Sequence, residues 1–189
     1  MIILRERIKR FEGTKKKLYY DSEGNLTGGY GHNFSSKGIP PRILNKYYNP
    51  NWVFNEIPET IIDELLDIDI EDCFYDLVRI FDLKNFGCKN DFCLYNEIDI
   101  EKALLPKQVV YVLVDMMFNM GKERFMGFKN MIDAVDKKDW RAMALEIRDS
   151  VYWNMCEDLR LLLVNKGVKR AYNRAQMNID LVLELVKIC

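Results

Sequence analysis

Residues 11–33, FEGTKKKLYYDSEGNLTGGYGHN, constrain the fold of this chain more than any other stretch. Gly24, Gly28, Gly29 and Gly31 are concentrated in it. Glycine adopts backbone conformations that other residues avoid, so such a cluster is typical of tight turns and close backbone approaches. Strand-like residues lie on either side of Gly24. The pattern therefore predicts a β-hairpin whose second strand is nearly bare of side chains.

The hairpin divides into three parts. Residues 18–21 are expected to form its first strand, residues 22–25 its turn and residues 26–30 its second strand. A third short strand is expected near Phe34. His32, the only histidine of the chain, stands at the end of the hairpin.

Glu12 ends the segment before the hairpin. Leu4, Ile8 and Phe11 recur at helical spacing, and Glu12 continues their stripe. A carboxyl group there faces packed surface, which disfavours its charged form. Gly13 is expected to end the helix in a left-handed conformation, and the negative end of the helix dipole acts on Glu12 in the same direction. Glu12 is therefore a candidate acid that keeps its proton near neutral pH, or else a glutamate paired with an arginine.

Asp21 supplies a second carboxyl group close to the first in sequence. An aspartate at the start of a turn often only bonds the nearby backbone. However, a protonated and an ionised carboxyl group facing each other are the groups that cleave a glycosidic bond. Thr27, on the partner strand, offers a hydroxyl that orients a water beside Asp21. The glycines after Thr27 would let a sugar ring approach the backbone.

No metal or cofactor is expected. The segment from Asp21 to His32 does not fit a calcium loop, because its glycine falls at position four and its twelfth residue is not acidic. One histidine and scattered thiols do not build a zinc site. The cysteines are expected to be reduced. They are Cys73, Cys88, Cys93, Cys156 and Cys189.

Composition excludes several classes of protein. The 189 residues suit one domain, and 49% of them are apolar. Lys and Arg number 28 against 29 Asp and Glu, so no strong attraction for nucleic acid is expected. No apolar run reaches the length of a membrane span. Charges interrupt the N-terminal residues MIILRERIKRF, so we expect no signal peptide.

Most of the remaining chain has helical periodicity. The first helix is expected at residues 2–12, and a long one begins after Pro58. The most apolar helix opens at Pro106 and ends at Gly121, and the loop at residues 86–100 looks like an insertion. Further helices are expected at 128–135, 139–148, 156–165 and 168–188.

Glu12 followed by YYDSEGNLTGGYGHN resembles the E…Y-x-D-x-x-G-x-x-T-x-G-x-G-H signature of phage-type lysozymes, glycoside hydrolase family 24. Weaker matches follow in order: MMFNMG at 116–121 with Gly127-Phe128, SVYWN at 150–154, and Asn173-Arg174-Ala175.

The resemblance implies a fold as well as an activity. The expected fold is α+β, predominantly helical and lysozyme-like, in a single catalytic domain of two lobes. A small β-containing lobe would cover about 13–57, a connecting helix about 58–82, and a helical lobe about 83–189 together with 1–12.

The implied activity is that of a muramidase, which cleaves β-1,4 bonds between N-acetylmuramic acid and N-acetylglucosamine in peptidoglycan. Glu12 would be the general acid and Asp21 the opposite carboxylate, while Thr27 would hold the attacking water, with inversion at the anomeric carbon. Gly31, Phe118 and Asn119 are expected to bind the saccharide. Arg174 would reach Glu12, and His32 would pair with Asp69 as a structural anchor.

The resemblance also implies a role in cell-wall lysis by a phage. The protein would be made in the host cytoplasm and would act on peptidoglycan in the periplasm, as a monomer, either free or carried on the virion, without inserting stably into a membrane. Two alternatives stay open: a lytic transglycosylase, and a catalytically silent binding or structural protein of a virion.

Overall fold

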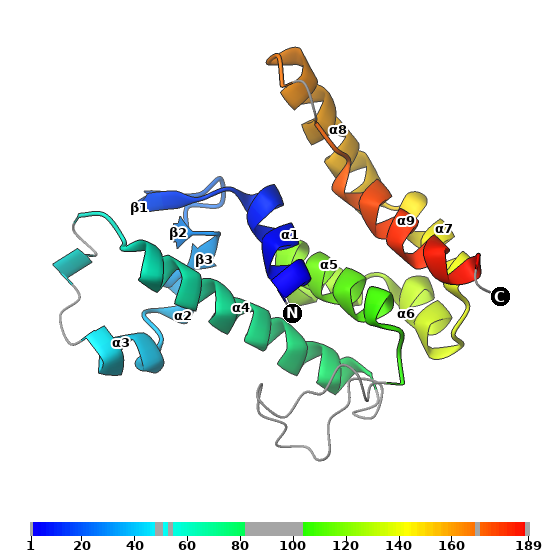
Figure 1. Ribbon diagram of the computed structural model, residues 1–189, viewed down its shortest axis with the longest axis horizontal. Helices are drawn as coiled ribbons and strands as arrows, with labels where there is room; N and C mark the ends of the chain where they lie inside the picture. Colours follow the sequence, from blue (N-terminus) through cyan, green and yellow to red (C-terminus); the bar gives the residue numbers. More distant parts are fainter. Residues whose placement is uncertain (1, 48–50, 53–54, 82–103, 169–170, 188–189) are drawn as a thin grey trace. The chain divides into compact units, whose positions relative to one another are not determined.

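The computed structural model describes residues 2–47, 51–52, 55–81, 104–168 and 171–187 (Figure 1). This part of the chain is predominantly helical and contains one small antiparallel sheet. The predicted α+β class is therefore confirmed. The chain divides into two compact units, residues 1–74 and residues 75–189, which are described here in turn.

The sheet of the first unit contains three strands in the order β1-β2-β3. They are β1 (Lys15–Tyr20), β2 (Leu26–Gly29) and β3 (His32–Asn33), and they follow α1 (Ile2–Glu12). The predicted hairpin and first helix are thus confirmed, although β1 begins three residues before the expected start. Gly24 in the turn has a φ of 82°, a conformation that suits glycine.

The sequence predicted a third short strand near Phe34, and β3 ends directly before this residue, at Asn33. Phe34 instead opens the short helix α2 (Phe34–Lys37). The side chain of Asn33 causes the change, because its Oδ1 accepts a hydrogen bond from the backbone N–H of Ser36 at 3.0 Å and caps the helix. The expectation of a third short strand near Phe34 is therefore confirmed.

Gly28 lets β2 pack closely against the core of this unit. A Cβ at this position would lie 2.8 Å from Cδ1 of Ile57 and 2.9 Å from Cδ2 of Leu18. A side chain at this position would require the terminal methyl groups of Ile57 and Leu18 to move. The core beneath comprises Ile43, Trp52, Ile57, Ile61, Ile62 and Leu65.

Two more helices complete the first unit. They are α3 (Pro41–Tyr47) and the long α4 (Glu59–Ile80), which continues past the division at Phe74. The predicted long helix after Pro58 is confirmed, since the carbonyl of Pro58 accepts hydrogen bonds from the N–H groups of Ile61 and Ile62, both at 3.0 Å.

The second unit is built from helices alone in its described part. They are α5 (Lys107–Met126), α6 (Lys129–Asp136), α7 (Trp140–Arg148), α8 (Val151–Asn165) and α9 (Arg174–Val186). Helix α9 packs against α5, α7 and α8. Gly121 interrupts α5 with a φ of 76°, so the predicted stop there is a kink, after which the chain turns helical again. The predicted insertion at 86–100 lies outside the described residues.

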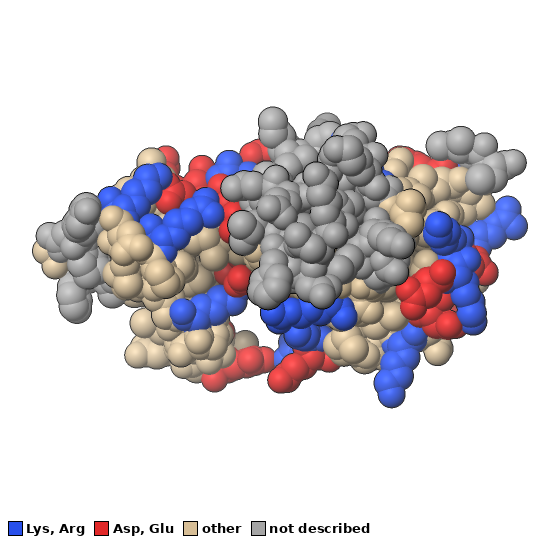
Figure 2. All heavy atoms as spheres, turned by 90° about the horizontal axis from the view of Figure 1, so that it is seen from below, with Lys and Arg blue, Asp and Glu red and all other residues tan. Residues whose placement is uncertain are grey.

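Charged side chains of both signs cover the surface. On the face drawn in Figure 2, basic and acidic side chains lie interspersed among the described residues. No helix in the described residues has the length and apolarity to cross a membrane. The structure describes two cysteines, Cys73 and Cys156, and neither forms a disulfide with another described residue.

Candidate active site

Glu12 is the last residue of α1. Gly13 follows with a φ of 65°, and its N–H bonds the carbonyl of Lys9 at 3.2 Å. This is the predicted left-handed helix end. Leu4 and Ile8, which share the stripe of Glu12, have no exposed surface. Glu12 itself is half-buried, so its carboxyl group is next to packed side chains and within reach of solvent.

Asp21 is held at the start of the hairpin turn by donors on neighbouring residues. Its Oδ1 accepts hydrogen bonds from the backbone N–H groups of Glu23 and Asn25, each at 2.9 Å. Its Oδ2 lies 3.4 Å from the side-chain nitrogen Nδ2 of Asn25 and also 3.4 Å from the hydroxyl oxygen of Thr27. The hydrogen bond from the Asn25 backbone, followed by that from Glu23, lowers the pKa of Asp21. These hydrogen bonds favour the ionised form of Asp21.

Thr27 lies on β2 and is only 4% exposed. Its hydroxyl oxygen is 3.1 Å from the carbonyl of Asn25 and 3.4 Å from Oδ2 of Asp21. A hydroxyl carries one proton, so it donates to one of these acceptors at a time and keeps lone pairs for a water. The pair offers a water both a hydroxyl and a carboxylate oxygen.

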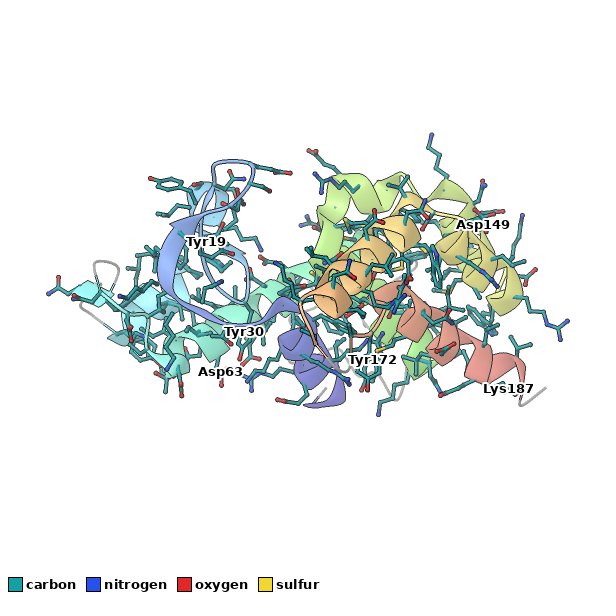
Figure 3. All side chains as sticks on the ribbon, turned by 90° about the horizontal axis from the view of Figure 1, so that it is seen from above. Tyr19, Tyr30, Asp63, Asp149, Tyr172 and Lys187 are labelled. Carbon is teal, nitrogen blue, oxygen red and sulfur yellow. The ribbon has the colours of Figure 1, made fainter. Side chains whose placement is uncertain are left out.

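Tyr19 is related both to Thr27, by its position in the sheet, and to Asp21 and Glu12, by the effect of their charges on its pKa. It lies on β1 (Figure 3), directly opposite Thr27 in the antiparallel ladder. Burial raises the pKa of the Tyr19 phenol, and the charges of Asp21 and Glu12 raise it further. Because both charges act on one phenol, the two carboxyl groups lie near the same side chain. The structure thus places Thr27 beside Asp21 and opposite Tyr19.

His32 is 2% exposed and anchors the end of the hairpin. Its Nδ1 lies 3.0 Å from both carboxylate oxygens of Asp69, and its Nε2 lies 3.0 Å from the carbonyl of Gly38. The Nζ of Lys37 donates hydrogen bonds to the carboxylate of Asp69 and to that of Asp72, each at 2.7 Å. The predicted pairing of His32 with Asp69 is therefore present, and both partners are buried in one hydrogen-bond network.

The other predicted substrate contacts are dispersed over the two units. Gly31 is exposed, with a φ of 101°, in the turn between β2 and β3. Phe118 and Asn119 are half-buried on α5 in the second unit. Oδ1 of Asn119 is buried and accepts no hydrogen bond from the described residues. Saccharide binding by these three residues stays a prediction.

Arg174 lies in a buried polar network at the start of α9. Its guanidinium donates to both oxygens of Asp115, each at 3.0 Å. Asn178 donates to Asp115 at 2.9 Å and lies 3.1 Å from the hydroxyl of Tyr152. The predicted contact of Arg174 with Glu12 would join the two units, and it stays a prediction.

Sequence reasoning missed Asp115 and Tyr19 as members of these clusters. A signal for Asp115 was present, because it is the one charged residue in the apolar run 109–118, and a buried charge needs a partner. Tyr19 stands within the motif, but only the strand register shows that it faces Thr27 and that the adjacent Tyr20 does not. In the described residues, no group of three His, Cys, Asp or Glu side chains is placed to hold a metal ion.

Comparison with known proteins gives one informative relative. No protein-family model matches the chain. A protein named "Probable T4-type lysozyme 2", from Dictyostelium discoideum, is 27% identical over 159 residues, which cover 80% of this chain and 84% of the relative. The alignment spans most of both chains, so the similarity is not confined to the hairpin motif. The resemblance to phage-type lysozymes is thereby confirmed.

Proposed function

We propose that this chain is a peptidoglycan hydrolase, a muramidase that cleaves the β-1,4 bonds between N-acetylmuramic acid and N-acetylglucosamine. One observation supports the proposal most: Asp21 contacts the Thr27 hydroxyl in the hairpin that follows the helix ending at Glu12, and the charges of both carboxylates act on Tyr19, opposite Thr27. Similarity to a protein named as a T4-type lysozyme supports the same chemistry.

Glu12 acts as the general acid. It transfers its proton to the glycosidic oxygen as the bond from that oxygen to the anomeric carbon breaks. Glu12 is half-buried at the end of α1, on the same stripe as the buried Leu4 and Ile8.

Asp21 and Thr27 act on the opposite side of the bond. A water held by the Thr27 hydroxyl attacks the anomeric carbon, and the Asp21 carboxylate takes the proton that this water loses. Hydrogen bonds from the backbone keep Asp21 ionised, so its negative charge also stabilises the positive charge that develops on the sugar. Attack by a water on the far face inverts the anomeric carbon.

This chemistry suits lysis of a bacterial wall by a phage. The proposed enzyme is made in the host cytoplasm and meets peptidoglycan in the periplasm, either after release or on the virion. It acts as a monomer, without nucleic acid and without stable insertion into a membrane.

Turbidity loss of bacteria with a permeabilised outer membrane tests the proposal. Glu12→Gln keeps the shape of the side chain and removes the acidic proton, and general acid catalysis contributes roughly 10²–10⁴-fold. We expect a loss of that size. Glu6→Gln is the matched control, since Glu6 lies on the same helix and is exposed. Lysis at equal rates by the parent and Glu12→Gln would reject the proposal and favour a catalytically silent lysozyme-fold protein.

A lytic transglycosylase is the second candidate, and it needs an acid but no attacking water. The contact between Thr27 and Asp21 favours hydrolysis over this alternative, because it gives a water two partners. Mass spectrometry of the products separates the two reactions, since hydrolysis adds a water to the released sugar and transglycosylation leaves an anhydro-sugar.

A further inference from the structure

We propose that Tyr19 is a substrate-contacting residue, which places its ring against a sugar at the bond that is cut and donates a hydrogen bond from its hydroxyl to that sugar. The inference rests on the proposed function and adds a residue to the same site. Its basis is the strand register, the free hydroxyl and the partial exposure of the ring.

The register puts Tyr19 on the catalytic face of the hairpin. Tyr19 pairs with Thr27, and Tyr20 pairs with Leu26. Side chains directly opposite each other in antiparallel strands share one face, with Cβ atoms about 4.5–5.5 Å apart. Successive side chains of a strand alternate between faces, so Asp21 falls on the side of Tyr19, and Tyr20 falls on the other.

The hydroxyl of Tyr19 is available to a ligand. Among the described residues, none forms a hydrogen bond with it, whereas the nearby Asp21 and Thr27 are both bonded. Burial and the charges of Asp21 and Glu12 raise the pKa of the phenol, so it keeps its proton. A neutral phenol donates a hydrogen bond, and sugar hydroxyl and acetamido oxygens accept one.

The ring is also placed to touch a sugar. Tyr19 is 37% exposed, against 73% for Tyr20, so one part of its ring is packed and the rest is open to solvent. A tyrosine fixed in this way offers an apolar face with a polar tip, the combination that suits a ligand with both kinds of surface. The charges of Asp21 and Glu12 both act on the Tyr19 phenol, so a sugar that contacts this ring lies within the candidate active site.

Tyr19 and Tyr20 form a matched pair for the test. Tyr19→Phe removes the hydroxyl and keeps the ring, and Tyr19→Ala removes both, while Tyr20→Phe and Tyr20→Ala are the controls on the other face. With soluble peptidoglycan oligosaccharides, we expect Tyr19→Phe to lower kcat/KM by about 3- to 10-fold, the effect of one neutral hydrogen bond. Tyr19→Ala should lower it further, and both Tyr20 variants should match the parent.

A binding measurement separates contact with substrate from a structural role. In a Glu12→Gln background, which holds the oligosaccharide uncut, Tyr19→Phe should weaken its binding in calorimetry, and Tyr20→Phe should leave it unchanged. Equal binding and equal kcat/KM for the parent and Tyr19→Ala would overturn the inference, as would equal losses in the Tyr19 and Tyr20 variants. A parent chain that cuts no peptidoglycan would instead overturn the proposed function itself.

Discussion

The Thr27 hydroxyl lies 3.4 Å from Oδ2 of Asp21 and nearer, at 3.1 Å, to the carbonyl of Asn25. The hydroxyl has one proton for these two acceptors, so it donates to one of them at a time. Oδ2 of Asp21 also lies 3.4 Å from Nδ2 of Asn25, so both of its side-chain contacts are long for hydrogen bonds. In the proposed function, the hydroxyl and this carboxylate oxygen together hold the attacking water.

Removing the Thr27 hydroxyl should reduce activity without altering the hairpin. Thr27→Val keeps the branched shape that fills a site only 4% exposed, but it cannot hold a water. We expect kcat to fall by about 10²-fold, and Thr27→Ser to retain most of the activity. Initial rates on soluble peptidoglycan fragments provide the measurement. If Thr27→Val and Thr27→Ser are equally active, the hydroxyl does not position the water.

Asp21 should make stability depend on pH. Hydrogen bonds from the Asn25 and Glu23 backbone lower its pKa in the folded chain, whereas an unfolded aspartate titrates near about 3.9. Its contribution is therefore fully present above the unfolded pKa and is lost as the pH falls through the lower, folded pKa. The melting temperatures of the parent and Asp21→Asn should differ at about pH 6 and converge in acid. A difference that stays constant with pH would contradict this.

Gly28 should not tolerate a side chain. A Cβ there would meet Ile57 at 2.8 Å and Leu18 at 2.9 Å, and overpacking a core costs about 1–3 kcal/mol. Gly28→Ala should lower the free energy of unfolding by that amount in urea. Ile57→Val removes the nearer methyl group, so the double variant Gly28→Ala/Ile57→Val should recover part of the loss. Additive losses in the two single variants would show that the clash is absent.

The buried pair of Asp115 and Arg174 should matter far more for stability than an exposed pair. Asp115 has no exposed surface, and its removal takes away the buried carboxylate to which the Arg174 guanidinium donates two hydrogen bonds, at a cost of about 3–5 kcal/mol. The control is Asp133→Ala, which breaks an exposed pair with Lys137 that is worth less than about 1 kcal/mol. Chemical denaturation of Asp115→Ala and Asp133→Ala compares them, and similar losses would contradict the expectation.

Local chemistry predicted the first unit well and the second less closely. The glycines and the helix end at Gly13 were enough to predict the hairpin, because a few residues set the geometry of a turn. The first residues of the helices in the second unit were harder to predict from the sequence. Helix α8 begins at Val151, five residues before the expected start, since Ser150 accepts a hydrogen bond from the N–H of Trp153. Helix α9 begins six residues late, at Arg174, because Asn173 caps it.

Part of the candidate site could not be predicted from local sequence patterns. Glu12, Asp21 and Thr27 stand within one motif and were found from it. Which side of the strand each tyrosine occupies depends on the pairing register, and a shift of one residue would exchange Tyr19 and Tyr20. Arg174 and Asn178, which both donate to Asp115, come from α9, more than one helix away in sequence, so tertiary packing brings them together.

Digestion of purified peptidoglycan in water enriched in oxygen-18, with mass spectrometry of the fragments, tests the central claim most directly. The account predicts that the parent chain releases reducing N-acetylmuramic acid ends that carry one atom of the label, because the water between Asp21 and Thr27 attacks the anomeric carbon, and that Glu12→Gln releases almost none. Unlabelled anhydro-sugar ends, or equal release by the two proteins, would contradict it.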